Sequence, residues 1–175
     1  MSQSPSPLDA SRLVIHKSDS LRQCPPVKDI VFGRTFSDHM LKIPWTAARG
    51  WGEPSIEPYG PLSLEPSSVV LHYAVTLFEG MKAYRDDHGK VRLFRPEKNM
   101  ERMNRSASRI CLPNFDETEL LKLIKKLVQL DQHWVPSEPG YSMYIRPTLI
   151  GTEPSVSVTQ TSEALLFVIL SPVGP

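Results

Sequence analysis

The stretch Tyr141–Gly151, YSMYIRPTLIG, alternates polar and apolar side chains, and this alternation predicts a β-strand. One face carries the polar side chains, which are Ser142, Tyr144, Arg146 and Thr148. The other face is apolar and consists of Tyr141, Met143, Ile145 and Leu149. The apolar face belongs on a hydrophobic core, so this strand is expected to lie in a sheet with one covered side.

The polar face places a phenol, Tyr144, beside a guanidinium, Arg146. A guanidinium can bind a carboxylate through two parallel hydrogen bonds, and a phenol can donate one more. This pair predicts the wall of a site for a small carboxylic acid. The alternative is an ordinary half-exposed strand whose polar side faces water.

The composition favours one soluble intracellular domain. The chain has 175 residues and a net charge of +1, which argues against nucleic acid or an anionic membrane as a partner. Its longest apolar run, Ala164–Leu170, is too short to span a bilayer. Two cysteines cannot form a disulfide framework, and the histidines and cysteines show no metal-ligand spacing, so no metal is expected.

The chain is expected to divide into three parts. Residues 1–28, rich in serine and proline, are predicted to be a disordered tail, and residues 29–171 the folded domain. Residues 172–175 are predicted to begin a linker. Within the domain, His39–Trp45 is a plausible strand, which Pro44 would make an edge strand or a short one.

The remaining pattern predicts an α+β fold, a mostly antiparallel sheet with two main helices. Met81–Arg85 and Lys90–Phe94 are expected to form a hairpin, and Ala164–Leu170 a buried strand, whereas the period of Ser68–Glu79 does not decide between strand and helix. Pro96–Ile110 is predicted to be a helix. A second helix should start after Asp116, with Glu119 completing a capping box, and should bury one stripe, consisting of Leu120, Leu123, Ile124, Leu127, Leu130 and Trp134.

Three arginines, Arg102, Arg105 and Arg109, share one face of the first helix. A solvated basic flank is one interpretation; the other is that Arg102, next to the buried methionines, turns inward to a phosphate. Aromatic residues Tyr73, Phe78 and Tyr144 accompany the arginines. Together they suit an apolar small molecule that carries a carboxylate.

Four runs of sequence in this order resemble eukaryotic branched-chain amino acid aminotransferases: LHYAVTLFEGMKAYR, VRLFRPEKNMERMNRSA, YIRPTLIGTEPS and LLFVILSPVGP. The resemblance covers about Phe32 to the C-terminus. It implies the small N-terminal domain of the D-amino acid aminotransferase-like enzymes. These enzymes use pyridoxal 5′-phosphate (PLP) to move the amino group of leucine, isoleucine or valine to 2-oxoglutarate, and a homodimer is implied for the complete enzyme.

The resemblance also implies roles for individual residues. Arg102, in the run NMERM, would bind the cofactor phosphate. Tyr144 and Arg146 would line the substrate site, with Phe32, Tyr73 and Phe78 in its apolar walls. Val156 and Val158 match a loop that reaches into the neighbouring subunit's site, and Tyr73 would also serve across the dimer interface.

The Schiff-base lysine of the family lies in a second, larger domain, and no lysine of this chain sits in that motif; Lys82, after FEGM, is expected to face solvent. The chain is therefore predicted to hold no catalytic residue of its own and to be inactive alone. The alternative function is a truncated, non-catalytic partner that pairs with full-length subunits. The expected compartment is cytoplasmic, with mitochondrial as the alternative.

Overall fold

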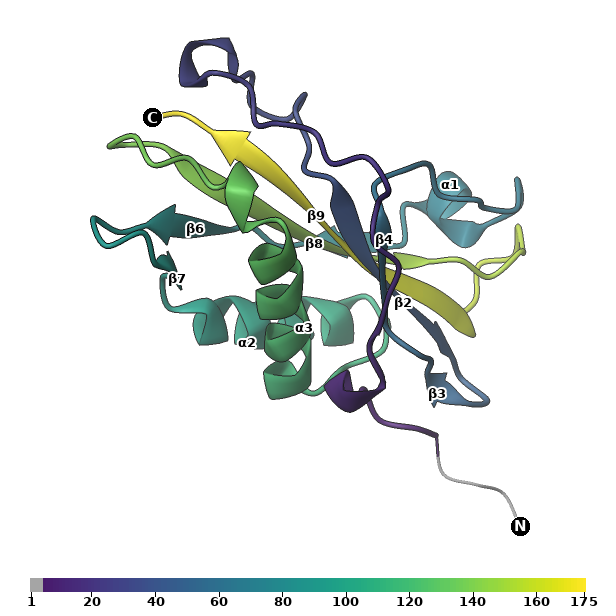
Figure 1. The fold of residues 1–175 in the computed structure, drawn as a ribbon. Helices are drawn as coiled ribbons and strands as arrows, with labels where there is room; N and C mark the ends of the chain where they lie inside the picture. Colours follow the sequence, from purple (N-terminus) through teal and green to yellow (C-terminus); the bar gives the residue numbers. More distant parts are fainter. Residues whose placement is uncertain (1–4) are drawn as a thin grey trace.

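The computed structural model describes residues 5–175, which form one twisted sheet with two long helices on one face (Figure 1). The strand order is β1-β4-β2-β9-β8-β6-β7; in addition, β3 pairs with β2, and β5 pairs with β8. The strands are β1 (Val14–Ile15), β2 (His39–Thr46), β3 (Gly50–Trp51), β4 (Ser55–Pro58), β5 (Thr76–Phe78), β6 (Met81–Arg85), β7 (Val91–Leu93), β8 (Ser142–Gly151) and β9 (Glu163–Val173). All named pairs are antiparallel except β1 with β4, so the predicted α+β class with a mostly antiparallel sheet is confirmed.

The middle of the sheet is the long pair of β8 with β9. Its register runs from Ser142 opposite Val173 to Gly151 opposite Ala164. The strand predicted over Tyr141–Gly151 is confirmed, and its apolar side chains at Met143, Ile145 and Leu149 are fully buried. β9 is longer than the predicted Ala164–Leu170, because residues 172 and 173 continue the pairing instead of beginning a linker.

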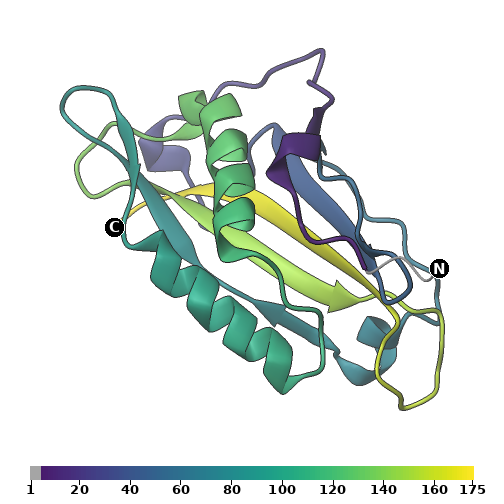
Figure 2. The ribbon, with the colours of Figure 1, turned by 90° about the horizontal axis from the view of Figure 1, so that it is seen from below.

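Helices α2 (Pro96–Arg109) and α3 (Glu117–Leu130) pack on the same face of the sheet (Figure 2). α2 contributes Met100 and Met103 to the core, both completely buried. The buried side of α3 is wider than the predicted stripe, since Leu121 and Val128 are buried as well and Leu130 is only partly buried. None of the helices in the described part of the chain is long and apolar enough to cross a membrane.

The N-terminus of α3 is capped, but not by the predicted capping box. Oδ1 of Asp116 accepts hydrogen bonds from the N–H groups of Thr118 and Glu119, at 2.8 and 3.0 Å. The Glu119 carboxylate does not turn back to this helix start; its Oε2 accepts from the backbone N–H of Ala10 at 2.8 Å. The second half of the motif is therefore used to hold the N-terminal segment.

The N-terminal segment from residue 5 onward packs on the domain, which differs from the disordered tail expected over 1–28. Leu8 is buried in the hydrophobic core, and β1 pairs in parallel with β4. Further along, Arg22 forms an ion pair with the buried carboxylate of Asp38 at 3.1 Å. Each contact is long-range in sequence, so local composition could not reveal it; residues 1–4 lie outside the described part.

Strand β2 lies inside the sheet, which corrects the edge position inferred from Pro44. It pairs with β9 on one side and with β4 and β3 on the other. Pro44 falls between the residues paired with β4 and those paired with β3, and its carbonyl accepts from the N–H of Gly52 at 2.8 Å. The nitrogen of Pro44 points to this gap, where a missing N–H breaks no ladder.

The ambiguous stretch Ser68–Glu79 contains a helix and a strand. α1 (Val69–Tyr73) ends at Ala74, whose φ of 51° lies in the left-handed region, and β5 follows. Two elements in one apolar run explain why no single period fitted it. The hairpin of β6 and β7 is present as predicted, with Gly89 at a φ of 77° in its turn.

Candidate active site

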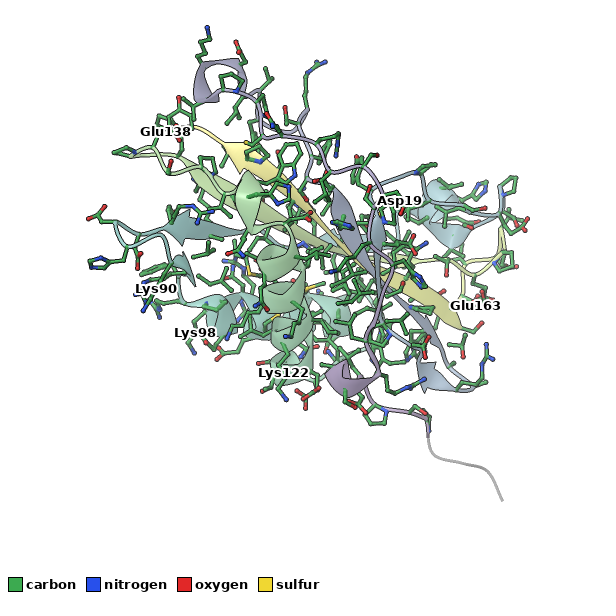
Figure 3. The ribbon with its side chains drawn as sticks, in the orientation of Figure 1. Asp19, Lys90, Lys98, Lys122, Glu138 and Glu163 are labelled. Carbon is green, nitrogen blue, oxygen red and sulfur yellow. The ribbon has the colours of Figure 1, made fainter. Side chains whose placement is uncertain are left out.

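The face of β8 that the helices leave uncovered carries Tyr144 and Arg146, both partly exposed. Phe78 of β5 lies directly opposite Thr148, so its side chain is on this same face. We call the four residues Phe32, Phe78, Tyr144 and Arg146 the open-face cluster. The charged residues Lys90, Lys98 and Lys122 lie on the hairpin of β6 and β7 and on the outer sides of α2 and α3 (Figure 3).

Direct contacts hold the open-face cluster together. Nη2 of Arg146 donates to the phenol oxygen of Tyr144 at 2.8 Å, and the guanidinium carbon stands 4.4 Å from the Phe78 ring centroid. Phe32 meets Tyr144 edge-to-face at a centroid distance of 5.3 Å. The structure thus brings together four of the residues predicted from the sequence, as aromatic walls around one cation.

Arg146 has a donor without a partner. Its Nε is buried and makes no hydrogen bond with the described residues. A buried unpaired donor costs about 1–3 kcal/mol, and more when it belongs to a charged group. The arrangement therefore leaves one donor of the Arg146 guanidinium unsatisfied beside the exposed rings of Phe32 and Phe78.

Arg102 makes a close ion pair with Glu79, which lies between β5 and β6. Nε and Nη2 of Arg102 both donate to the Glu79 carboxylate, the second at 2.8 Å. Glu79 is buried, whereas the Arg102 side chain is 56% exposed. Two further donors, Nδ2 of Asn99 and the N–H of Gly80, reach the same carboxylate at 3.0 Å.

These contacts set the charge of the pair. Burial by itself raises the pKa of Glu79, but hydrogen bonds from Arg102, Asn99 and Gly80 outweigh it and leave that pKa below its usual value. The hydrogen bond to Glu79 raises the pKa of Arg102 further. Both side chains are therefore ionised at neutral pH.

The residues Glu79 and Gly80 form a corner that touches both arginine sites. β5 pairs with residues 148–150 of β8 and β6 with residues 143–145, so the corner faces the gap at Arg146 and Pro147. The N–H of Glu79 donates to the Pro147 carbonyl at 2.9 Å. A Cβ added to Gly80 would lie 2.0 Å from the phenol oxygen of Tyr144, so only glycine allows this approach.

A shallow depression of about 370 Å³ adjoins Arg102 and is lined by Phe94, Arg95, Lys98, Asn99 and Arg102. Arg95, at the N-terminal boundary of α2, has a φ of 46°, a left-handed conformation rare for a residue with a side chain. Three cationic side chains around one hollow suit an anionic group such as a phosphate ester.

Tyr73, Val156 and Val158 form a separate group beyond the far end of β8. The Tyr73 hydroxyl donates to the Val156 carbonyl, and the Tyr73 ring lies beside the ring of His72. Val158, in the loop between β8 and β9, is 83% exposed. Among the described residues, no hydrogen bond or ring contact joins Tyr73, Val156 or Val158 to the open-face cluster.

Sequence reasoning missed Glu79, Gly80 and Asn99. The available signal was Glu79, a single acid in the apolar run Ser68–Glu79, which predicts a buried partner cation. Lys82 is partly exposed and lies opposite Tyr144 on the open face, which agrees with the expected solvent-facing position.

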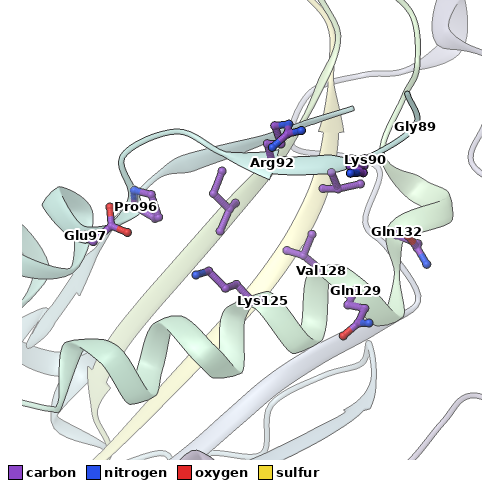
Figure 4. A pocket seen from close by; sticks show the side chains of 11 residues that line it. Gly89, Lys90, Arg92, Pro96, Glu97, Lys125, Val128, Gln129 and Gln132 are labelled. Atoms are coloured by element: carbon purple, nitrogen blue, oxygen red, sulfur yellow. The ribbon is translucent and has the colours of Figure 1, made fainter. Parts of the chain in front are cut away.

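A second hollow, of about 790 Å³, lies at the β7 edge of the sheet and contains none of the predicted site residues (Figure 4). Val128 and the stem of Lys125 on α3 face β7 across it. Its mixed lining of basic, amide and aliphatic side chains shows no convergent set of groups.

Comparison with known proteins gives a consistent family. Residues 76–175 match the family model described as amino-transferase class IV. The mitochondrial branched-chain-amino-acid aminotransferase of Saccharomyces cerevisiae is 57% identical over 97% of this chain, and the enzyme of Dictyostelium discoideum 50% identical over 96%. The chain spans 43% and 45% of the length of these two relatives.

Solved structures agree on the fold. A branched-chain aminotransferase from Thermoproteus uzoniensis with norvaline covers 75% of this chain, with 25% identity and a TM-score of 0.59; the match spans 41% of that protein. The branched-chain amino acid aminotransferase from Escherichia coli covers 77% of this chain and 41% of its own, with 21% identity and a TM-score of 0.53. A further branched-chain amino acid aminotransferase, solved with pyridoxamine 5′-phosphate, covers 76% of this chain with 23% identity and a TM-score of 0.56.

Proposed function

Because this chain belongs to the class IV amino-transferase family, we propose that it supplies half of a PLP site that transaminates branched-chain amino acids with 2-oxoglutarate. The observation that supports this proposal is the joined pair of subsites. The corner of Glu79 and Gly80 contacts Arg102 on one side and the strand of Tyr144 and Arg146 on the other.

The open-face cluster is the substrate end. Arg146 and Tyr144 bind and orient a substrate carboxylate, because a guanidinium can donate two parallel hydrogen bonds to a carboxylate and a phenol can donate one more. The rings of Phe78 and Phe32 provide apolar wall for an aliphatic side chain, which such a wall distinguishes by about 1–3 kcal/mol per methylene. Either carboxylate of glutamate can occupy this pair of donors when glutamate takes the place of leucine.

Arg102 is the phosphate end. Its exposed guanidinium borders the cationic depression with Arg95 and Lys98, so the donor set fits a phosphate ester. When bound, PLP supplies the electron sink for the carbanion at the substrate Cα. The contribution of this chain is to bind and orient, through Arg102 at the phosphate and Arg146 at the carboxylate.

Tyr73, Val156 and Val158 serve a neighbouring subunit in this proposal. They lie away from the open-face cluster, and Val156 and Val158 are exposed. In a homodimer the loop that carries Val156 and Val158 would extend the apolar wall of the partner's site, and Tyr73 on α1 would serve across the same interface. The compartment stays a prediction, cytoplasmic with mitochondrial as alternative, since both forms occur among the relatives.

The 175-residue chain alone is expected to give no turnover, since none of its lysines matches the family's Schiff-base motif. Leucine-dependent glutamate formation with added PLP should equal the protein-free control. A clear excess would contradict this expectation.

Substrate binding tests the proposal directly. In a ¹H–¹⁵N NMR titration with 4-methyl-2-oxopentanoate, the oxo acid of leucine, we expect shifts at Tyr144, Arg146 and Phe78. Arg146→Met should abolish them, while Arg49→Met, on an exposed turn between β2 and β3, should not. Shifts confined to other surfaces would refute the proposed substrate end.

A second candidate is a non-catalytic partner that pairs with full-length subunits. The exposure of Phe78 and Val158, at 63% and 83%, favours it, because large exposed apolar groups mark interaction surfaces. Co-purification with a full-length branched-chain aminotransferase would support pairing. A strictly monomeric chain that never associates would exclude it.

A further inference from the structure

The Glu79 carboxylate lies in the corner between β5 and β6 and accepts four hydrogen bonds. Two come from Arg102, one from Asn99 and one from the N–H of Gly80. The residue is 4% exposed, and its backbone N–H donates a hydrogen bond to the Pro147 carbonyl. A buried carboxylate with these partners is held in place and can orient the guanidinium that donates to it.

The Arg102 side chain is long and exposed, so it needs a partner to hold it in one orientation. It leaves α2 and is 56% exposed, and a long exposed side chain loses rotamer entropy when it is held in one position. The two hydrogen bonds to Glu79 engage Nε and Nη2 and fix the plane of the guanidinium. The remaining N–H groups then have a defined direction.

We propose that Glu79 is a positioning residue, which fixes the Arg102 guanidinium so that its remaining N–H groups face a phosphate group in the depression formed with Phe94, Arg95 and Lys98. The inference deepens the proposed function and rests on it. Glu79 does not touch the phosphate; it acts through Arg102, and Asn99 secures the arrangement by also donating to the Gly80 carbonyl at 3.0 Å.

Glu79 could affect phosphate binding in two opposite directions, and this difference makes the positioning role testable. Glu79 also cancels the charge of Arg102, so removing its charge would strengthen phosphate binding if neutralisation were its main effect. If positioning dominates, removing the charge weakens binding. Arg95 lines the same depression and keeps it cationic while Glu79 is ionised, whereas the charge of Lys98 is paired with Glu101 at 2.7 Å. The sign of the change therefore separates the two roles.

The experiment uses the 175-residue chain and pyridoxine 5′-phosphate, which carries the phosphate but no aldehyde to react with lysines. Pyridoxine, without phosphate, is the matched ligand. Affinities come from ¹H–¹⁵N NMR, which also follows the Nε–H of Arg102. Glu79→Gln should weaken binding of the phosphate ester about tenfold, since charge-assisted hydrogen bonds are lost, and leave pyridoxine unchanged.

Two further variants control the result. Glu79→Asp keeps the charge but withdraws it by one methylene, so it should give an intermediate loss. Glu57→Gln removes a different ion pair, between Glu57 and Lys42 at 2.8 Å on β4 and β2, and should bind like the wild type. In the Glu79 variants the Arg102 Nε–H should also exchange faster with water before any ligand is added.

The outcomes are distinct. Equal or tighter binding of the phosphate ester by Glu79→Gln overturns the positioning role alone. A wild-type chain that shows no phosphate-dependent shift at Arg102 overturns this inference together with the proposed phosphate end. If circular dichroism shows that Glu79→Gln is unfolded, Glu79→Asp decides, and wild-type affinity in that variant overturns the role.

Discussion

The two faces of strand β8 differ in what covers them. On one face Met143, Ile145 and Leu149 are fully buried, with α2 and α3 on the same side of the sheet. On the other face Tyr144 and Arg146 are only partly buried, and Phe78 beside them is 63% exposed. The alternation of one strand therefore separates a face that stabilises the fold from a face that is available to bind.

The largest expected effect comes from the covered face. Ile145→Ala should lower the free energy of unfolding by about 2–5 kcal/mol, because it removes buried methylenes and leaves a cavity. Urea denaturation followed by circular dichroism measures this change. A loss below about 1 kcal/mol would mean that the covered face is not the stabilising one.

Gly80→Ala tests the corner at which both faces meet. The new Cβ would lie 2.0 Å from the Tyr144 hydroxyl, so the phenol must shift from the position in which it accepts from Arg146. We expect a loss of about 1–3 kcal/mol, typical of overpacking, and a change in the near-ultraviolet circular dichroism. Gly60→Ala is the control, since its Cβ would meet only a carbonyl oxygen at 3.9 Å. Equal stability of the two variants would contradict the close approach.

The pH dependence of stability tests the buried carboxylate between the faces. The pKa of Glu79 is lowered in the folded protein, so its stabilising contribution is present above the unfolded value of about 4.3 and is lost as pH falls through the folded pKa. Denaturation midpoints between neutral pH and about pH 3 should fall for the wild type and fall less for Glu79→Gln. Parallel curves would show that Glu79 does not contribute this linkage.

The smallest effect is expected on the open face. Phe78→Ala removes a larger side chain than Ile145→Ala, yet it should cost only about 0.5–1 kcal/mol, the value of an exposed cation–π contact with Arg146. The same urea titration compares the two variants directly. If Phe78→Ala were as destabilising as Ile145→Ala, the distinction between the two faces would be lost.

The sequence predicted elements where the pattern was local. The strand at Tyr141–Gly151, the hairpin and the start of α2 at Pro96 follow from alternation, a glycine turn and a proline in the first helical turn. The polar face of β8 was assigned correctly at Tyr144, Arg146 and Thr148, which are partly exposed, whereas Ser142 at the start of the strand is buried. Within the open-face cluster, Phe78, Tyr144 and Arg146 follow from the alignment of side chains on neighbouring strands, whereas Phe32 lies in a turn and reaches Tyr144 from a distant part of the chain.

What could not be predicted depended on partners distant in the chain. The Glu119 carboxylate has a backbone N–H available in its own helix start, but it binds Ala10 instead. Pro44 looked like an edge residue, because nothing local reveals a gap between two partner strands. Likewise the Arg102 partner, Glu79, is on a different element, and its burial becomes evident only when β5 and β6 are placed against β8.

The pairing of β2 with β9 has a consequence for biosynthesis. Leu41 and Ile43 of β2 are fully buried. Their partners across the sheet, Val168 and Leu166, follow 127 and 123 residues later in the chain (168 − 41 and 166 − 43) and are therefore synthesised much later. Contacts of such high contact order form slowly and keep apolar strand surface exposed on the nascent polypeptide. The pairing of β2 with β9 can therefore form only after β9 has been synthesised, and until then the apolar residues of β2 remain available to chaperones.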